Sequence, residues 1–381
     1  MQRFVTNFLV LIGVLTALYG SPQAFSTQHE NMPATNNSVV GAATGAVSAP
    51  LPVRHIALLL PLKSHSFERA AEMVRQGFMA ASIREKEALA VRVYPTSDDD
   101  MDILIAYQQA LDAGAAIVVG PLTRNGVSAL ASSKLVRVPT LALNAPDGDA
   151  ATPPNLFLFG LQVEIEARQA ARLAVAENRH HAFIINDGSA LSGRLQAAFA
   201  DEWLKLGSVY ASASTSADAL KFDGKQTMLV KLRGRTAGDE NLVFLALDAA
   251  KSRMLRSYLD PATPVYATSQ IFTGGSDSLL NHDFNEVRFL DMPWLLQPDH
   301  PAVMAYRRPD LPMSAELERF YALGIDALRL AQLMLKPHPA GGIALDGVTG
   351  RISLVAPRQF VREPVVARFY QGEVQLQDKL K

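Results

Sequence analysis

Short apolar runs alternate with amphipathic helical patterns from about residue 53, and this alternation constrains the fold more than any other feature of the sequence. The run "HIALLLPL" at 55–62 is apolar throughout, which is typical of a strand buried on both faces of a sheet. The next segment repeats apolar residues at three- and four-residue spacing, which predicts a helix with one buried face. The residues on that face are Phe67, Ala70, Ala71, Val74, Phe78 and Ala81.

The alternation continues in two series. The first predicts strands at 90–94, 115–119 and 138–143 and helices at 101–113 and 126–133. The second predicts helices at 163–178, 192–206, 225–233 and 249–259 and strands at 181–186, 208–213, 241–247 and 264–268. An amphipathic helix at 316–335 and a turn into a strand at 343–355 follow. Such βαβ alternation favours parallel sheets covered by helices, so the chain is predicted to form two α/β lobes with a central cleft.

The composition of the chain fits a two-lobed protein and excludes every kind of site that needs cysteine. The chain has 381 residues, 49% of them hydrophobic and 19% charged, which is enough to build a core in each of two lobes. The formal net charge of −1 does not point to nucleic acid as a partner. The absence of cysteine excludes disulfides, thiolate metal sites, a cysteine nucleophile and a lipid anchor on a cysteine.

The first 26 residues have the pattern of a signal peptide. Arg3 precedes a short apolar segment at 8–20, and Ala24 and Ser26 place small residues at a cleavage site. A retained membrane anchor is the alternative, although the apolar segment is short for a membrane-spanning helix. Residues 27–52 are rich in Thr, Asn, Ala, Gly, Ser and Pro and are expected to form a flexible linker. The mature protein is therefore expected in the periplasm, with association with the outer membrane left open.

The stretch "AAIVVGPLTRNG" at 115–126 ends a predicted strand abruptly. In parallel sheets ligands bind beyond the carboxyl ends of the strands, where this stretch places Gly120, Pro121 and Leu122. Glycine allows close approach of a ligand, and the following helix start offers free N–H groups. The alternative, which we favour, is that Gly-Pro turns the chain and caps a helix.

Further candidates lie at the same rim and at that of the second lobe. Leu62 and Lys63 end the first strand, and Asn144 and Ala145 end the fourth, where Asn144 either donates to a ligand or makes an Asx turn. The second lobe offers three polar candidates that either face the cleft or cap a helix. They are Ser189, Ser192 and Gln270.

The sequence has no recognisable catalytic or metal-binding motif. It lacks a G-x-S-x-G elbow, a dinucleotide-binding G-x-G-x-x-G after a strand and a Walker lysine pattern. The acidic run at 97–102 is better explained by capping, with Ser97 or Asp98 at the start of the next helix. We read His180 and His181 as turn and surface residues. We therefore expect no enzymatic activity, no cofactor and no metal site.

Seven segments, taken in order, resemble the penicillin-binding protein activator family of the LpoA/LppC type, within the type I periplasmic binding protein superfamily. They span residues 53–376 and read "ALLLPL", "VVGPLTRNGVSAL", "VPTLALN", "VEIEARQAARLA", "FADEWLKLG", "YATSQIF" followed by "VRFLDMPWLL", and "RFYALGIDALRLA" followed by "LDGVTGRISL". The resemblance is to the C-terminal domain of that family. It implies two Rossmann-like lobes joined by three crossovers. The first lobe would comprise 53–160 plus 300–336 and the second 161–299 plus 337–376, with a tail at 377–381.

The resemblance also implies a function. The family suggests a regulator of peptidoglycan synthesis that binds a penicillin-binding protein, whereas the wider superfamily suggests binding of a small, amino-acid-like ligand between lobes that hinge. An amino-acid site should hold the α-ammonium group with a carboxylate. The rim positions Leu62, Lys63, Leu122 and Asn144 provide no carboxylate, which favours the protein partner.

Overall fold

The computed structural model describes residues 53–85, 89–148, 152–209, 216–221, 240–274, 278–309, 313–337, 342–355 and 358–377. The predicted signal peptide (1–26), the predicted helix at 225–233 and residues 378–381 of the predicted tail lie outside these ranges, as does the predicted linker (27–52).

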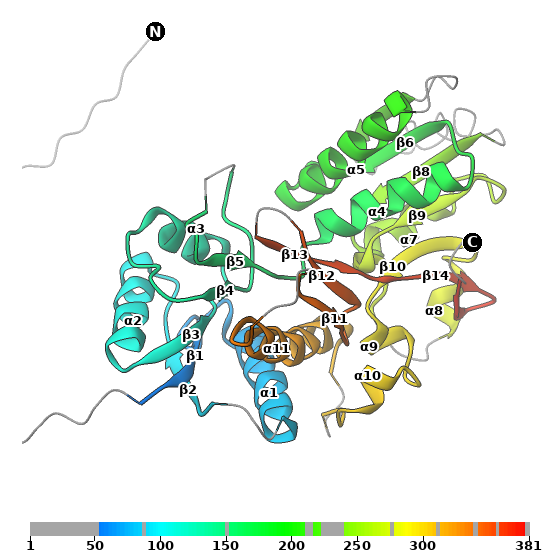
Figure 1. Ribbon diagram of the computed structural model, residues 1–381. Coiled ribbons are helices and arrows are strands. Elements are labelled where there is room, and N and C mark those ends of the chain that lie inside the picture. Colours follow the sequence, from blue (N-terminus) through cyan, green and yellow to red (C-terminus); the bar gives the residue numbers. More distant parts are fainter. Residues whose placement is uncertain are drawn as a thin grey trace, which may run out of the picture. The chain divides into compact units, whose positions relative to one another are not determined.

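The first lobe is built on an eight-stranded sheet in the order β11-β12-β13-β5-β4-β3-β1-β2 (Figure 1). Its strands are β1 (His55–Leu60), β2 (Val91–Pro95), β3 (Ala115–Val119), β4 (Thr140–Ala142), β5 (Leu156–Leu158), β11 (Ala344–Asp346), β12 (Arg351–Val355) and β13 (Gln359–Glu363). Within this order, β2, β1, β3, β4, β5 and β13 pair with their neighbours in parallel. The remaining two pairings, β13 with β12 and β12 with β11, are antiparallel.

Helices cover both faces of this sheet because the side chains of each strand alternate between the faces. Ile56, Leu58 and Leu60 pack with α1 (Glu68–Arg84) and α11 (Ala315–Met334). Ala57 and Leu59 pack with α2 (Asp100–Asp112) and α3 (Arg124–Ser132). The fully buried β1 matches the continuous apolar run in the sequence.

The second lobe is built on a seven-stranded sheet in the order β15-β14-β10-β9-β8-β6-β7. Its strands are β6 (His181–Asn186), β7 (Ser216–Lys221), β8 (Asn241–Ala246), β9 (Val265–Ala267), β10 (Val287–Asp291), β14 (Val365–Tyr370) and β15 (Glu373–Leu376). Two helices, α4 (Val163–Ala176) and α5 (Ala190–Val209), pack on one face. The other face packs with α7 (Ala249–Arg256), and α8 (Ser278–His282) lies near β14 and β15. Two parallel-dominated sheets with helices on both faces confirm the predicted α/β architecture.

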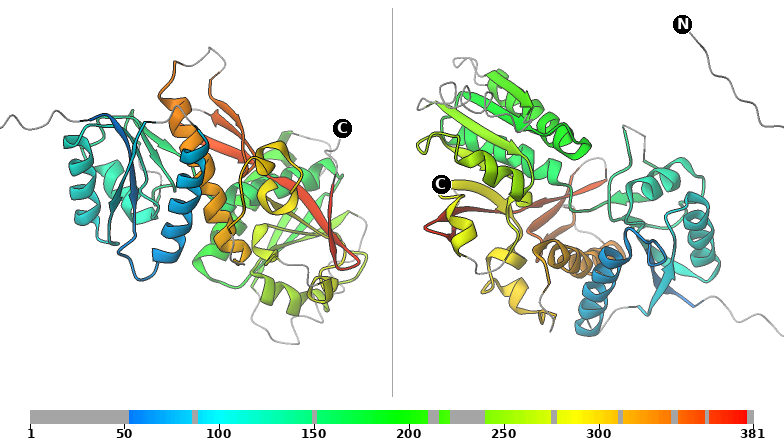
Figure 2. Two further views of the ribbon diagram at one scale, coloured as in Figure 1. Left: turned by 90° about the horizontal axis from the view of Figure 1, so that it is seen from below. Right: turned by 180° about the vertical axis from the view of Figure 1, so that it is seen from behind.

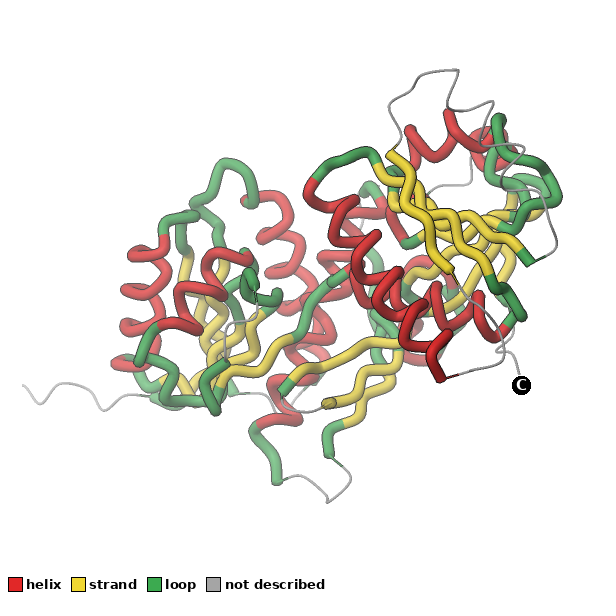
Figure 3. The backbone as a smooth tube through the Cα atoms, turned by 90° about the horizontal axis from the view of Figure 1, so that it is seen from above, coloured by secondary structure: helices red, strands yellow, loops and turns green. Residues whose placement is uncertain are grey.

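The chain passes between the lobes three times, after β5, after β10 and after β13 (Figures 1 and 3). After β10 it continues through the short helices α9 (Pro293–Leu296) and α10 (Pro301–Met304), and Trp294 and Val303 contribute to the core of the first lobe. Between β13 and β14 only Pro364 separates a strand of the first sheet from a strand of the second.

Glycines let α1 and α11 pack closely against the same face of the first sheet (Figure 2). A Cβ atom on Gly77 would lie 1.9 Å from the carbonyl oxygen of Tyr321, and one on Gly324 would lie 2.1 Å from the carbonyl oxygen of Val74. Any larger residue at either position would therefore overlap the backbone of the facing helix. This contact gives a structural reason for the glycines in "RQGFMAA" and "YALGIDALRLA".

A buried aspartate on α11 holds the loop between β11 and β12. The Asp326 carboxylate accepts hydrogen bonds from Val348 N at 3.1 Å and from Thr349 N and Oγ1 at 2.8 and 2.7 Å. Arg329 lies 3.2 Å from the same carboxylate, and burial raises the pKa of Asp326 despite these partners. A Cβ on Gly347 would lie 2.5 Å from Asp326 Oδ2, so this loop fits only around a glycine.

The sheet pairings correct the expected lobe boundary. Residues 337–376 were expected in the second lobe, but β11, β12 and β13 belong to the first sheet and only β14 and β15 join the second. The reason is physical: Asp326 ties the β11–β12 loop to α11, and β13 then pairs with β5.

Two local expectations also differ. The strand expected at 208–213 does not begin at 208, because α5 continues to Val209; residues 210–213 lie outside the described ranges, and the strand that pairs with β6 is β7. The cap of α2 is Asp99 and not Ser97 or Asp98, since Asp99 is the extended residue directly before the first helical one. Its carboxylate accepts from Met101 N at 2.9 Å and from Asp102 N at 3.1 Å.

Candidate functional site

The Gly120-Pro121 turn is tied to the neighbouring strands. Gly120 has a positive φ of 110°, and a Cβ there would lie 2.0 Å from the carbonyl oxygen of Leu59. Gly120 N donates to Leu141 O at 2.8 Å, and Pro121 O accepts from Leu143 N at 2.9 Å. The glycine is thus needed for packing against β1, and its N–H is already engaged within the sheet.

The other candidates of this rim also have partners within the protein. Asn144 donates from Nδ2 to Leu122 O at 3.0 Å, and its Oδ1 accepts from the N–H of Ala145 at 3.0 Å, so its side chain holds the turn. Leu62 packs against the core of the first lobe. Lys63 is exposed, and its backbone N–H donates to Thr96 O at 2.9 Å.

A pocket of about 400 Å³ opens beside this rim. Its lining joins Leu122 and Asn144 to residues that the sequence analysis did not single out, among them Thr123, Arg124 and Asp147. Thr123 is 4% exposed, and its Oγ1 has no hydrogen-bond partner among the described residues. Among the residues that line this pocket, this hydroxyl is the one buried side-chain atom that has no hydrogen-bond partner in the described structure.

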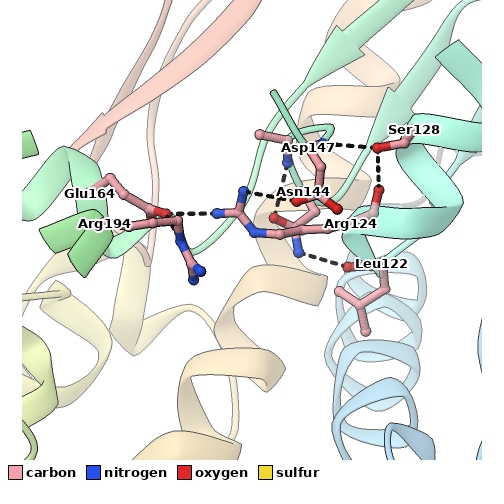
Figure 4. A network of polar contacts seen from close by, with 8 residues as sticks. Leu122, Arg124, Ser128, Asn144, Asp147, Glu164 and Arg194 are labelled. Carbon is pink, nitrogen blue, oxygen red and sulfur yellow. Dashed lines mark hydrogen bonds and ion pairs between the residues drawn. The ribbon is translucent and has the colours of Figure 1, made fainter. Parts of the chain in front are cut away.

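An ion-pair bridge connects this rim to the second lobe (Figure 4). Arg124 Nη2 at the start of α3 lies 2.8 Å from Glu164 Oε1 at the start of α4, and Arg194 Nε of α5 lies 2.8 Å from the same oxygen. Asp147 lies 3.9 Å from Arg124. Ser128 Oγ donates to Arg124 O at 3.0 Å and accepts from Asp147 N at 2.8 Å. The bridge therefore uses the charges that border the pocket. The sequence gives no signal for it, because Arg124, Glu164 and Arg194 lie far apart along the chain.

The second-lobe candidates come together around a small pocket of about 120 Å³, lined by Ser189, Ser192, Gln270, Asp187 and Lys251 among others. Ser192 is buried; its Oγ donates to Ala246 O and accepts from Asp187 N at 3.1 Å. Ser189 Oγ accepts from Ser192 N at 3.2 Å, as a helix-capping residue would.

One lysine pairs with two carboxylates of this second rim. Lys251 Nζ lies 2.6 Å from Asp187 and 2.9 Å from Asp248. Burial raises the pKa of Asp187, but the hydrogen bonds from Lys251 and Ser189 outweigh it and hold the pKa well below its ordinary value. At neutral pH this rim therefore carries paired charges.

The described part of the chain has neither a cluster of metal ligands nor a membrane-spanning helix. No group of three or more His, Cys, Asp or Glu residues is placed to hold a metal ion there. In the same ranges, every helix is too short or too polar to span a bilayer.

Comparison with known proteins reveals relatives over most of the chain. A protein-family model described as "LppC putative lipoprotein" matches residues 49–372. The penicillin-binding protein activator LpoA of Pantoea ananatis is 26% identical over 394 residues, covering 93% of this chain and 56% of its own. The LpoA of Edwardsiella piscicida is 28% identical over 299 residues, covering 69% of this chain and 42% of its own. The chain thus spans about half the length of these curated relatives.

Solved structures share the fold. A protein from Chromobacterium violaceum, described as "a putative branched-chain amino acid ABC transporter", is 39% identical with a TM-score of 0.69, covering 83% of this chain and 99% of its own. The C-domain of Haemophilus influenzae LpoA, "a regulator of PBP1A", is 22% identical with a TM-score of 0.71, covering 85% of this chain and all of its own. At that identity the second likeness concerns the fold alone. Because the family model matches most of its length, the chain belongs to the LppC family.

Proposed function

We propose that this protein is a non-enzymatic regulator that is exported to the periplasm and activates peptidoglycan synthesis by binding a penicillin-binding protein. Its curated relatives are named penicillin-binding protein activators. The observation that carries the proposal is the state of the two rims: the side chains of the predicted contacts Asn144, Ser189 and Ser192 are hydrogen-bonded within the protein. Asn144 holds its own turn and Ser192 binds the end of β8.

The interlobe bridge supports the same proposal. Arg124 and Arg194 could each hold the carboxylate of a small ligand, but both share Glu164. A ligand entering there would have to replace an ion pair whose Glu164 side chain is 15% exposed. A partner that docks on an outer surface meets no such competition.

The experiment has two stages. The chain beginning at Thr27 is immobilised and exposed to membrane extract, and captured penicillin-binding proteins are identified by covalent labelling with a fluorescent penicillin. The captured protein is then purified, and its rate of peptidoglycan synthesis is measured with and without this chain. A saturable increase in rate is expected. Direct binding without any change in rate, or no capture of a labelled protein, would contradict the proposal.

A second candidate function is binding of an amino-acid-like ligand in the 400 Å³ pocket. Two observations favour it: the unpartnered Oγ1 of Thr123 and the description of the Chromobacterium violaceum relative. A thermal-shift screen with the twenty amino acids tests it, because a specific ligand stabilises the folded state by mass action. Thr123→Val is the matched variant, since it keeps the shape of the side chain and removes only the free hydroxyl. Saturable stabilisation that Thr123→Val abolishes would establish this second function.

A further inference from the structure

Two buried arginine–carboxylate pairs join the lobes at the places where the chain crosses between them. In the first, Arg319 of α11 binds Asp291 at the end of β10, with Nη2 to Oδ2 at 2.6 Å and Nε to Oδ1 at 3.1 Å. In the second, Arg362 of β13 binds Glu166 of α4, with Nη2 to Oε1 at 2.5 Å. Asp291 is completely buried, Glu166 and Arg362 are at most 2% exposed and Arg319 is 9% exposed, so solvent and salt screen both pairs only weakly.

The short helix η1 (Ser269–Ile271) of the second lobe connects the two pairs. Ser269 N donates to Glu166 Oε2 at 2.8 Å, and Ser269 O accepts from Arg319 Nη2 at 3.0 Å. Arg319 Nη2 also donates to Phe272 O at 2.8 Å. The two arginines belong to elements of the first lobe, whereas their carboxylates and the η1 backbone belong to the second. The network therefore holds two positive and two negative charges that balance only while the lobes stay together.

The network also reaches each of the three crossovers. Asp291 Oδ1 accepts from Met292 N at 2.8 Å, where the chain leaves β10. Glu166 lies in the first turn of α4, which follows the crossover after β5. Arg362 is two residues before Pro364, where β13 leads into β14. Any rotation of one lobe about these connections would separate a buried guanidinium from its carboxylate.

Separation of the Arg362–Glu166 pair would be costly because the arginine has few other partners. Nε and Nη1 of Arg362 have no hydrogen-bond partner among the described residues, so Glu166 is the only acceptor that its guanidinium has there. A buried charge without its partner is strongly unfavourable. The Arg124–Glu164 bridge differs, because Arg124 is 27% exposed and salt can screen it.

We propose that the Arg319–Asp291 and Arg362–Glu166 pairs lock the two lobes in a single arrangement, so that the protein presents a preformed surface to its partners and does not open and close around a ligand. The inference stands independently of which partner the protein binds. A protein locked in this way differs from two-lobed receptors, which close around a ligand by a hinge motion.

The absence of cysteine from the chain allows a direct test. Gln109 of α2 and Ala197 of α5 are exposed and lie in different lobes. The double variant Gln109→Cys/Ala197→Cys carries two spin labels, and pulsed dipolar spectroscopy measures the distribution of distances between them. We expect a single narrow distribution that is the same at low salt and at 1 M salt. A broad or two-peaked distribution in this parent protein would overturn the proposal.

Three variants of the spin-labelled protein identify the groups that hold the lobes in one arrangement. Glu166→Gln keeps the shape of the side chain but removes its charge, and it should broaden or shift the distribution. Arg124→Gln removes the exposed bridge and should leave the distribution narrow. Arg253→Gln, which removes an ion pair with Asp283 inside the second lobe, is the matched control. Equal broadening by Arg124→Gln and Glu166→Gln would refute the assignment to the buried pairs. If Glu166→Gln does not fold, the parent protein still gives the test: a distance distribution that broadens at 1 M salt would refute the proposal.

Discussion

The close contact between α1 and α11 predicts what a single methyl group added at Gly324 does to stability. In Gly324→Ala the new Cβ would lie 2.1 Å from Val74 O and 2.8 Å from Phe78 N, whereas non-bonded heavy atoms settle at about 3.5 Å. Both clashing atoms are backbone, so no side-chain rotation relieves them, and the helices must separate by roughly 1 Å. Overpacking of this kind costs about 1–3 kcal/mol. Alanine recovers about 1 kcal/mol through its higher helix propensity, so the free energy of unfolding should fall by up to about 2 kcal/mol.

Urea denaturation followed by circular dichroism measures this cost. Gly193→Ala is the matched control, because Gly193 lies in α5 and a Cβ there would meet nothing within 4 Å. The control should raise the free energy of unfolding by up to about 1 kcal/mol, since only the helix propensity changes. The reasoning is refuted if Gly324→Ala stabilises the protein as Gly193→Ala does, because the close approach of the two helices would then be unnecessary.

Three further predictions concern separate features. Asp326→Asn should lower the free energy of unfolding by about 1–3 kcal/mol in urea titrations, because one carboxylate oxygen is replaced by an NH₂ group that faces the N–H donors of the β11–β12 loop. Asp187→Asn should cost about 1 kcal/mol at neutral pH and less in acid: the folded pKa of Asp187 is lowered, so its contribution is fully present well above the unfolded value of about 3.9 and declines as the pH falls below that value, as paired melts from pH 7 to pH 2 will show. A chain that ends at residue 299 lacks α11 and uncovers the face of α1 that it packs on, so it should aggregate in light scattering; a monomer with a sharp cooperative melt would contradict this.

Substitution of Gly120 is not a useful test of whether the cleft binds a ligand. Replacing Gly120 with a bulky residue would block a ligand, but the new Cβ would lie 2.0 Å from Leu59 O on a backbone with φ of 110°. Such a variant would lose stability whether or not the cleft is used. Thr123→Val and Arg124→Gln examine the same rim without that conflict, because both positions lie outside the contact with β1.

The sequence was sufficient for elements whose pattern is local. β6 is observed at the predicted residues, 181–186, and α11 is observed at 315–334 against a predicted 316–335. In both, the periodicity of apolar residues follows directly from burial on the sheet or against α1. The strand expected from residue 208, by contrast, does not begin there, because the continuation of α5 to Val209 overrides the local preference of those residues.

Features that depend on distant partners could not be read from the sequence. Nothing near β13 shows that it pairs with β5, about 200 residues earlier in the chain. The pair formed by Glu166 and Arg362 is separated by 196 residues, and neither residue stands out from the other charged residues of the chain. The candidates of the first rim lie just beyond β1, β3 and β4, as the pattern of strands predicts, but their hydrogen-bond partners, such as Leu122 O for Asn144, depend on loop geometry that has no pattern in the sequence.

The late position of β13 in the chain has a consequence for how the protein folds. β13 lies between β5 and β12 in the first sheet, so that sheet cannot be completed until residues 359–363 have been synthesised. β14 and β15, which complete the second sheet, come later still. Contacts between such distant segments form slowly, because a long loop must close before they stabilise anything. Residues up to 363 must therefore be made before the first sheet is complete, and residues up to 376 before the second is. A nascent chain that stays incompletely folded for so long fits the proposed passage across a membrane.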